Sequence, residues 1–221
     1  MTPGPVTPRG RAGAELVVGV LLLLAVAVSG LYFTVRPWPT FFDRWAFQAI
    51  GFRHHSDFLL LVTRLGSPFV VGAAAVAGFL AAMRRNRPRA VALLVGPTLA
   101  VALCDWVVKP VVGRTFAGVE SFPSGTVTAV AAMATVLVLA TPDRWRSVAG
   151  TIGGTVTLLT GTAVVALGWH FPTDAFAGVQ LGVGVVLLTD CATRWSSSWR
   201  ASRRGRAHSG PRPDAERSAA H

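Results

Sequence analysis

The sequence has few cysteines and few charged side chains, and both shortages narrow the class of protein. Only Cys104 and Cys191 occur in 221 residues, so no disulfide framework is predicted. Charged residues make up 14% of the chain and hydrophobic residues 52%, an apolar share above that of an ordinary soluble domain. The mean hydropathy is +0.51. The composition therefore predicts a membrane protein.

Acidic side chains are scarce as well, since 10 Asp and Glu stand against 21 Lys and Arg, for a formal net charge of +11. Such an excess is also found in nucleic-acid-binding proteins, but here the arginines gather in short segments between apolar runs and in the C-terminal tail. This distribution is the positive-inside pattern of membrane proteins. We therefore predict membrane lipids as partners and no nucleic acid.

The apolar runs predict an all-α fold, a bundle of six transmembrane helices in one domain over residues 15–195. A cleaved signal peptide competes for the first run, but that run is longer than a signal-peptide core. The aromatic residues near 40–52 predict an amphipathic interfacial helix between the first and second spans. The predicted spans cover residues 15–35, 67–83, 90–108, 124–140, 147–167 and 175–193.

The two ends of the chain are predicted to be disordered cytoplasmic tails, residues 1–14 and the basic residues 196–221. With both termini cytoplasmic, 15 of the 21 Lys and Arg residues fall on the cytoplasmic side. This asymmetry predicts a multi-pass protein of the cell membrane whose loops after the third and fifth spans share the extracytoplasmic face.

The loop after the third span has the residues of an anion site. It holds Lys109 and Arg114 and leads into Ser124 and Gly125, where the next apolar segment begins. A helix that begins there offers unpaired backbone N–H groups and a positive dipole end. These four residues are the predicted phosphate-binding residues. Asp105, four residues before Lys109, is also placed for an intrahelical ion pair, and the two roles are compatible.

The loop after the fifth span carries His170 and Asp174, four residues apart, with Pro172 at a suitable first helical position. This spacing allows the carboxylate to orient the imidazole, which leaves the second ring nitrogen free to attack. We predict His170 and Asp174 as catalytic residues. The alternative is an interfacial histidine beside a helix-capping aspartate.

With these residues the chain resembles the type 2 phosphatidic acid phosphatase superfamily, membrane lipid phosphatases related to the vanadium haloperoxidases. The family motifs are Lys, six residues, Arg-Pro; then Pro-Ser-Gly-His; then Ser-Arg, five residues, His, three residues, Asp. Lys109 represents the first, Pro123-Ser124-Gly125 the second, and His170 with Asp174 the third. Over about residues 55–193, the resemblance implies a metal-independent hydrolase without a cofactor. It also implies a phosphohistidine intermediate and a lipid phosphate or polyprenyl diphosphate as substrate.

Several motif positions depart from the family pattern. Phe116 and Ala117 stand where the first motif has Arg-Pro, and Thr126 stands where the second has His. Ala163 and Val164 replace the Ser-Arg of the third. By the resemblance, two phosphate-binding arginines and the histidine that protonates the leaving group are missing. Impaired activity is the expected result.

We consider two hypothetical substitutes for the missing groups, with a polar interfacial loop as the alternative for the histidine pair. Arg114 lies two residues before the motif arginine position, and His54 or His55 is placed on the same face to serve as proton donor. The alternative function is a catalytically silent homologue that binds lipid phosphate headgroups or serves as a membrane assembly subunit. The lipid, the pathway and the oligomeric state are not indicated by the sequence.

Overall fold

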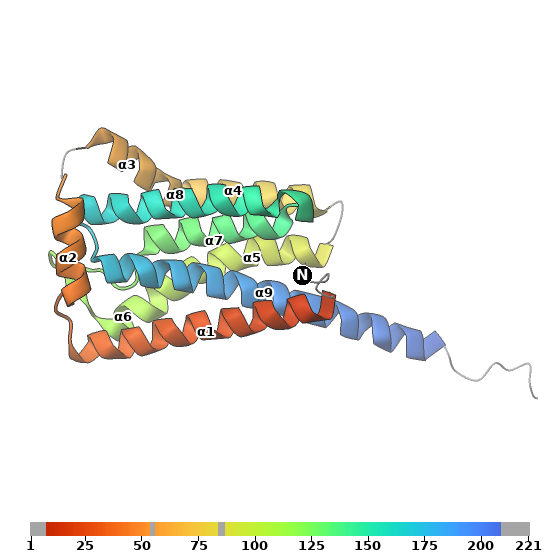
Figure 1. The fold of residues 1–221 in the computed structure, drawn as a ribbon. Coiled ribbons are helices and arrows are strands. Elements are labelled where there is room, and N and C mark those ends of the chain that lie inside the picture. Colours follow the sequence, from red (N-terminus) through yellow and green to blue (C-terminus); the bar gives the residue numbers. More distant parts are fainter. Residues whose placement is uncertain (1–7, 54–55, 84–86, 209–221) are drawn as a thin grey trace, which may run out of the picture.

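The computed structural model describes residues 8–53, 56–83 and 87–208, which form a bundle of helices with one short hairpin (Figure 1). The first half contains α1 (Pro8–Val35), α2 (Phe41–Ile50), α3 (Asp57–Thr63), the 3₁₀ turn η1 (Arg64–Gly66), α4 (Pro68–Met83) and α5 (Arg87–Leu103). The second half contains the π-helical η2 (Cys104–Val108), α6 (Lys109–Val112), β1 (Thr115–Phe116), β2 (Val119–Glu120), α7 (Gly125–Ala140), the 3₁₀ turn η3 (Asp143–Trp145), α8 (Arg146–Ala166) and α9 (Pro172–His208).

Helix α9 is the centre of the bundle, because it packs against α7, α1 and α5. Small residues allow the close approach to α7. A Cβ atom on Gly178 would lie 2.7 Å from the carbonyl oxygen of Ser124, and one on Gly182 would lie 2.4 Å from that of Thr128. In lipid no hydrophobic driving force acts between helices, and small residues allow the close van der Waals packing that holds them together. The contact fixes the start of α9 beside the start of α7.

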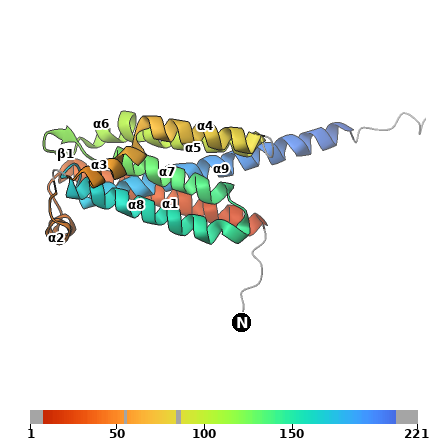
Figure 2. The same ribbon diagram turned by 90° about the horizontal axis from the view of Figure 1, so that it is seen from above.

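The two ends of the bundle differ in what they hold (Figures 1 and 2). The start of α1, the C-terminal part of α9 and the turn between α7 and α8 lie at one end. Helix α2, the β1–β2 hairpin and the turn between α8 and α9 lie at the other. The two loops predicted to share a face therefore do share one end of the bundle.

Fewer membrane spans are evident than the predicted six. Among the described residues, four helical stretches are long and apolar enough to cross a bilayer: Ala12–Val35, Ala90–Val112, Asp143–Ala166 and Pro172–Ser196. The pair Asp57–Gly66 and Phe69–Leu80, bent by 44°, makes a fifth if it is one span. Helix α7 matches the predicted fourth span in position but has 16 residues, short of the roughly 20 that a span needs.

Helical structure extends into both predicted tails. Helix α1 begins at Pro8 and α9 continues to His208, so residues 8–14 and 196–208, which the sequence analysis assigns to the tails, are helical. Arginine and alanine favour helix, and no proline occurs between Pro172 and Pro211 to break α9. Residues 1–7 and 209–221 lie outside the described residues.

Helix α2 crosses the end of the bundle, in the segment predicted to hold an interfacial helix (Figure 1). A capping box starts it: Asp43 N donates to Thr40 Oγ1 (3.1 Å), and Thr40 N donates to Asp43 Oδ2 (2.8 Å). It ends at Gly51, which has φ of 71°. Phe41 and Trp45 on this helix are exposed, whereas Asp43 is fully buried. The buried carboxylate points toward the site described next.

Candidate active site

The beginnings of α7 and α9 meet, as the sequence predicts. Ser124, the residue before α7, donates its backbone N–H to the backbone carbonyl of Asp174 in the first turn of α9 (3.0 Å). Ser124 and Asp174 are 50 positions apart in the sequence. The bond brings together the second and third motif segments, and with them the predicted phosphate-binding and catalytic residues.

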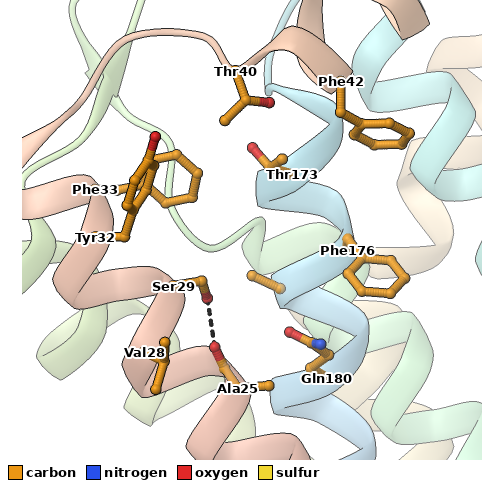
Figure 3. A pocket seen from close by; sticks show the side chains of 11 residues that line it. Ala25, Val28, Ser29, Tyr32, Phe33, Thr40, Phe42, Thr173, Phe176 and Gln180 are labelled. Carbon is orange, nitrogen blue, oxygen red and sulfur yellow. Dashed lines mark hydrogen bonds between the residues drawn. The ribbon is translucent and has the colours of Figure 1, made fainter.

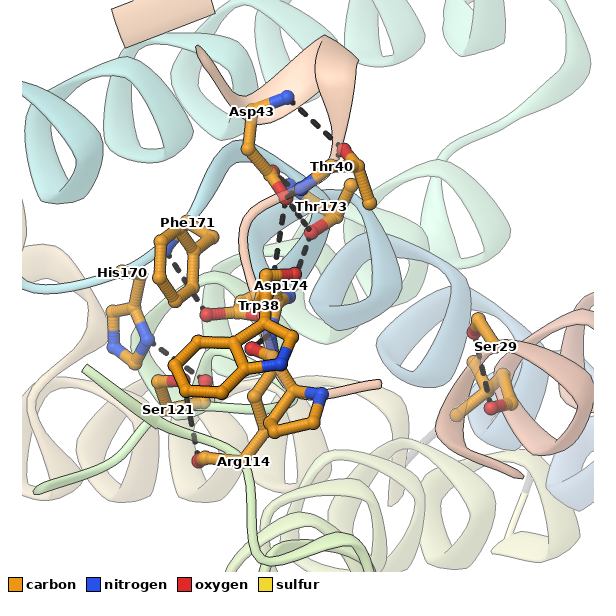
Figure 4. Close-up of polar contacts among 12 residues, drawn as sticks. Ser29, Trp38, Thr40, Asp43, Arg114, Ser121, His170, Phe171, Thr173 and Asp174 are labelled. Carbon is orange, nitrogen blue, oxygen red and sulfur yellow. Dashed lines mark hydrogen bonds and ion pairs between the residues drawn. The ribbon is translucent and has the colours of Figure 1, made fainter. Parts of the chain in front are cut away.

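His170 is held by a backbone carbonyl and not by the predicted aspartate. Its Nδ1 lies 2.9 Å from the carbonyl oxygen of Ser121 (Figure 4). Because a carbonyl only accepts, Nδ1 carries the proton and Nε2 keeps its lone pair. Burial lowers the pKa of His170 to about 4, against the opposing effect of the Ser121 bond, and the nearby Lys109 ammonium lowers this pKa further. The imidazole is therefore neutral at physiological pH.

Asp174 has other partners, so the prediction that its carboxylate orients His170 was wrong. Its Oδ1 accepts from Arg114 Nη1 (2.5 Å), and its Oδ2 accepts from the backbone N–H of Phe171 (3.0 Å). The second bond is a helix-capping contact, because Phe171 directly precedes α9. Asp174 does bond a residue close in sequence, Phe171, but its other oxygen bonds the buried Arg114 instead of His170.

Arg114 is fully buried, and all five of its N–H donors are used (Figure 4). The guanidinium also lies 3.8 Å from the ring centroid of Phe33 and 4.2 Å from that of Phe171. No donor remains for a phosphoryl oxygen, so the prediction that Arg114 binds phosphate is corrected to a structural role. The five acceptors are the carbonyls of Pro37 (3.1 Å) and Trp38 (3.4 Å), the hydroxyl of Thr173 (2.8 Å), and the carboxylates of Asp43 (3.0 Å) and Asp174 (2.5 Å).

Asp43 is a member of this network that the sequence reasoning missed. Besides Arg114, it accepts bonds from the backbone N–H (2.9 Å) and the hydroxyl (3.1 Å) of Thr173. Burial raises the pKa of the Asp43 carboxyl, but the hydrogen bonds from Thr173, Thr40 and Arg114 outweigh burial and hold the pKa below its usual range. The Thr40-x-x-Asp43 capping box was the available local signal, yet it does not reveal the partner 71 positions away.

Lys109 lies next to the start of α7. Its Nζ donates to Asp105 Oδ1 at 2.7 Å, which confirms the predicted intrahelical ion pair. A Cβ atom on Gly125 would lie only 3.4 Å from the same Nζ, so the ammonium adjoins the first residue of α7. The hydroxyl of Ser124 is buried, and it has no hydrogen-bond partner among the described residues. Lys109, Ser124 and Gly125 thus form a small polar site beside His170.

The first motif is altered by a hairpin. Strands β1 and β2 pair antiparallel, and the two residues between them, Ala117 and Gly118, have φ of 50° and 81°. Proline has φ fixed near −65°, so the family proline at position 117 is incompatible with this turn. Beyond the hairpin, Ser121 N donates to the carbonyl oxygen of Arg114 (2.8 Å). The hairpin thereby sets the position of the Ser121 carbonyl that holds His170.

Aromatic rings occupy the place of the first missing arginine. Phe116 packs edge-on against Phe171, with centroids 4.6 Å apart, and 5.9 Å from the centroid of Phe47. Phe47 also stacks on Phe52 at 5.0 Å. These four phenylalanines form an aromatic cluster that contacts the Arg114 guanidinium through Phe171, and the side chain at position 116 is part of that cluster.

The other departures are also occupied by packing residues. Val164 is fully buried in an apolar cluster with Val127 and Ala175. The side chain of Thr126 faces η1, since a Cβ atom on Gly66 would lie 2.6 Å from its methyl carbon. The suggested proton donors His54 and His55 lie outside the described residues. Among residues 8–53, 56–83 and 87–208, no three His, Cys, Asp or Glu side chains are grouped so as to hold a metal ion.

An open apolar groove of about 650 Å³ runs between α1 and α9 beneath the network (Figure 3). Thr40 and Thr173 line its upper end, and both also hydrogen-bond Asp43. The rest of the lining is mainly aliphatic and aromatic: Ala25, Val28, Ser29, Tyr32, Phe33, Phe42, Phe176, Ala177 and Gln180. The groove is chemically suited to a hydrocarbon chain.

Comparisons with known proteins agree with the motifs. A solved structure described as the first transmembrane PAP2 type phosphatidylglycerolphosphate phosphatase from Bacillus subtilis superposes with a TM-score of 0.59 at 23% identity. The match covers 75% of this chain and 92% of that one, and at this identity it shows a shared fold. Among curated protein sequences, none matches this chain significantly. The model of the PAP2 superfamily matches residues 14–197, so the resemblance seen in the motifs is confirmed and the chain belongs to the PAP2 superfamily.

Proposed function

We propose that this protein is a membrane lipid phosphate or diphosphate phosphatase of reduced activity, with His170 as its nucleophile. The observation that carries the proposal is the bond from His170 Nδ1 to the Ser121 carbonyl. This bond fixes the tautomer in which Nε2 is unprotonated. Lys109 and the start of α7 lie close by, and they supply the positive potential that a phosphoryl group requires.

In the proposed reaction, the Nε2 lone pair forms a bond to phosphorus while the bond from phosphorus to the leaving oxygen breaks. The leaving group departs with that electron pair and takes a proton from water. A water molecule then attacks the phosphohistidine, releases phosphate and restores the neutral imidazole. The residues described need neither a metal nor a cofactor for these steps.

Reduced activity is expected from the groups at the altered positions. Loss of a general acid costs about 10²- to 10⁴-fold in rate, and a threonine such as Thr126 does not replace imidazole as a proton donor near neutral pH. Each lost charge contact in the transition state costs about 10²- to 10³-fold more. A diphosphate tolerates the first loss better than a monoester, because its leaving group is a stabilised phosphate anion.

The membrane arrangement is part of the proposal. Residues 15–195 are one domain in which α7 is a sixth span, shielded from lipid over much of its length because its residues from Val127 to Ala132 are buried. Helix α2 lies at the interface, supported by its exposed aromatic side chains. The arginine distribution supports cytoplasmic termini and a site at the extracytoplasmic leaflet. The groove between α1 and α9 would hold the lipid chain.

A catalytically silent, headgroup-binding or assembly role is the second candidate, favoured by a specific observation. The guanidinium of Arg114 is saturated by protein acceptors, so it does not replace a missing cradle arginine. On this alternative, Lys109, Ser124 and Gly125 bind a lipid phosphate headgroup without turnover.

One assay separates the two candidates. Purified full-length protein in detergent is given phosphatidic acid or a polyprenyl diphosphate without added metal, and phosphate release is compared with that of His170→Ala. Release that disappears in the variant supports the enzyme. Equal release from both proteins, or lipid binding without any release, rejects His170 catalysis.

A further inference from the structure

Arg64 lies where an apolar helical segment breaks. The stretches Asp57–Gly66 and Phe69–Leu80 together are apolar enough to cross a bilayer, and they are bent by 44°. Arg64 is the only basic residue in either stretch, and it begins the 3₁₀ turn η1 just before the bend. Basic side chains within spans are rare and usually mark a functional position. A single arginine at this break therefore needs an explanation.

The guanidinium of Arg64 is available to a ligand. Arg64 is exposed, and in the part of the chain that the structure describes its side chain makes no hydrogen bond or ion pair. Arg114, by contrast, has all its N–H donors occupied by protein acceptors. The planar guanidinium fits phosphate oxygens with two parallel N–H bonds. Arg64 can therefore bind an anion without losing an existing contact.

The 3₁₀ turn that carries Arg64 packs directly against the start of α7. A Cβ atom on Gly66 would lie 2.6 Å from the carbonyl oxygen of Thr126 and 3.0 Å from its Cα. Thr126 follows Gly125, which adjoins the ammonium of Lys109. Arg64 precedes Gly66 by two residues, roughly 4 Å along a 3₁₀ turn, and the long apolar stem of arginine spans such a distance. Its guanidinium is thus within reach of the predicted phosphate position.

This position needs another cation. Helix α7 begins inside the bundle, short of the end that α8 reaches (Figure 1), and an anion that leaves water is costly unless it is paired. Lys109 and Arg114, the cations beside the two helix beginnings in the described residues, are already paired with carboxylates. Phe116 and Val164 occupy the family arginine positions and pack among apolar side chains. A replacement cation has to come from outside the motifs.

We propose that Arg64 binds the phosphoryl group of the lipid ligand and replaces one of the family arginines that this chain lacks. The inference rests on the proposed phosphoryl-binding function and adds a residue to that site. The competing role for Arg64 is that its side chain extends to the membrane surface and contacts headgroups in general. The two roles differ in whether Arg64 affects a lipid phosphate specifically.

Lipid binding to the full-length protein in detergent at pH 8 tests the inference, with phosphatidic acid as the probe. Arg64→Gln should weaken binding by at least about tenfold and leave Tm unchanged, because the side chain is exposed. Arg64→Lys keeps the charge without the paired donors, so its affinity should lie between those of Arg64→Gln and wild type. The matched control is Arg53→Gln, also at an exposed arginine, which should change affinity by less than about threefold.

Chemical labelling of the wild type needs no variant. Phenylglyoxal modifies exposed arginines, and peptide mass spectrometry follows each site separately. With phosphatidic acid at about ten times its Kd, modification of Arg64 should slow about tenfold, whereas that of Arg53 should not change. Phosphatidylcholine, whose phosphate is a diester next to a choline cation, should protect neither residue. This measurement still decides if Arg64→Gln does not fold.

Wild-type affinity in Arg64→Gln, or labelling of Arg64 that phosphatidic acid does not slow, overturns the inference and favours the membrane-surface role. The His170→Ala comparison of phosphate release is independent of that result and decides the proposed catalysis. Failure of the wild type to bind phosphatidic acid would overturn both the phosphoryl site and the role of Arg64.

Discussion

Replacing Arg114 by methionine should destabilise the fold strongly, because the change leaves two buried carboxylates without their cation. Asp43 and Asp174 both have 0% exposed side chains and both bond the guanidinium. Breaking a buried ion pair by removing one partner costs about 3–5 kcal/mol. For a chain of this length each kcal/mol lowers Tm by about 2–4 °C. The expected decrease in Tm is thus about 6–20 °C, measured by tryptophan fluorescence in detergent.

Neutralising Asp43 and Asp174 tests whether their unpaired charges cause the loss of stability. The triple variant Asp43→Asn, Arg114→Met, Asp174→Asn should recover at least about half of the lost Tm, because no uncompensated charge then remains buried. The matched control is Arg144→Met on the exposed η3 turn, which should lie within about 0.5 kcal/mol of wild type. An Arg114→Met protein with wild-type Tm that no longer binds lipid phosphate would show that Arg114 is a ligand contact, and the structural assignment would be refuted.

Three other predictions concern the nucleophile, the hairpin and the central helix contact. Because the pKa of His170 is lowered to about 4, kcat/KM should fall on the acid side only near pH 4, and an acid limb near pH 6.5 would contradict this. The contribution of the neutral imidazole to the stability of the fold is complete above about pH 6.5 and is lost as the pH falls toward 4. Ala117→Pro should abolish phosphate release, since φ of 50° excludes proline, whereas Ala117→Gly should raise the stability of the protein or leave it unchanged. Equal activity of both variants would show that the hairpin does not determine the orientation of His170. Gly182→Val should destabilise by about 1–3 kcal/mol or more through overpacking against Thr128, and an unaltered Tm would argue against the close contact of α7 and α9.

Local patterns were enough to predict where α7 and α9 begin and that the two motifs meet. The helix start at Gly125 follows Ser124, and α9 starts at Pro172, as capping and proline preferences indicate. The ion pair of Asp105 with Lys109 was likewise readable, because residues four apart on a helix are neighbours. Each of these inferences depends on residues close in sequence or on a motif whose parts are known to meet.

Partners that tertiary packing chooses were not predictable in the same way. Nothing near Arg114 indicates that it pairs with Asp43, 71 positions before it, or that the backbone carbonyl of Ser121 takes His170. A free arginine beside a motif is readily mistaken for a phosphate ligand. Its burial is the deciding fact, and burial of a particular side chain is a property of the assembled bundle.

The β1–β2 hairpin explains both departures from the first motif. A turn with φ of 50° at Ala117 excludes proline, and it directs Phe116 into the rings of Phe171 and Phe47. The same hairpin returns the chain so that Ser121 bonds the Arg114 carbonyl and presents its own carbonyl to His170. Restoring the motif arginine at position 116 alone would therefore place a charge among aromatic rings without recreating the cradle. Gain of activity should require rebuilding the whole turn, because one backbone conformation both excludes the family motif and orients the nucleophile.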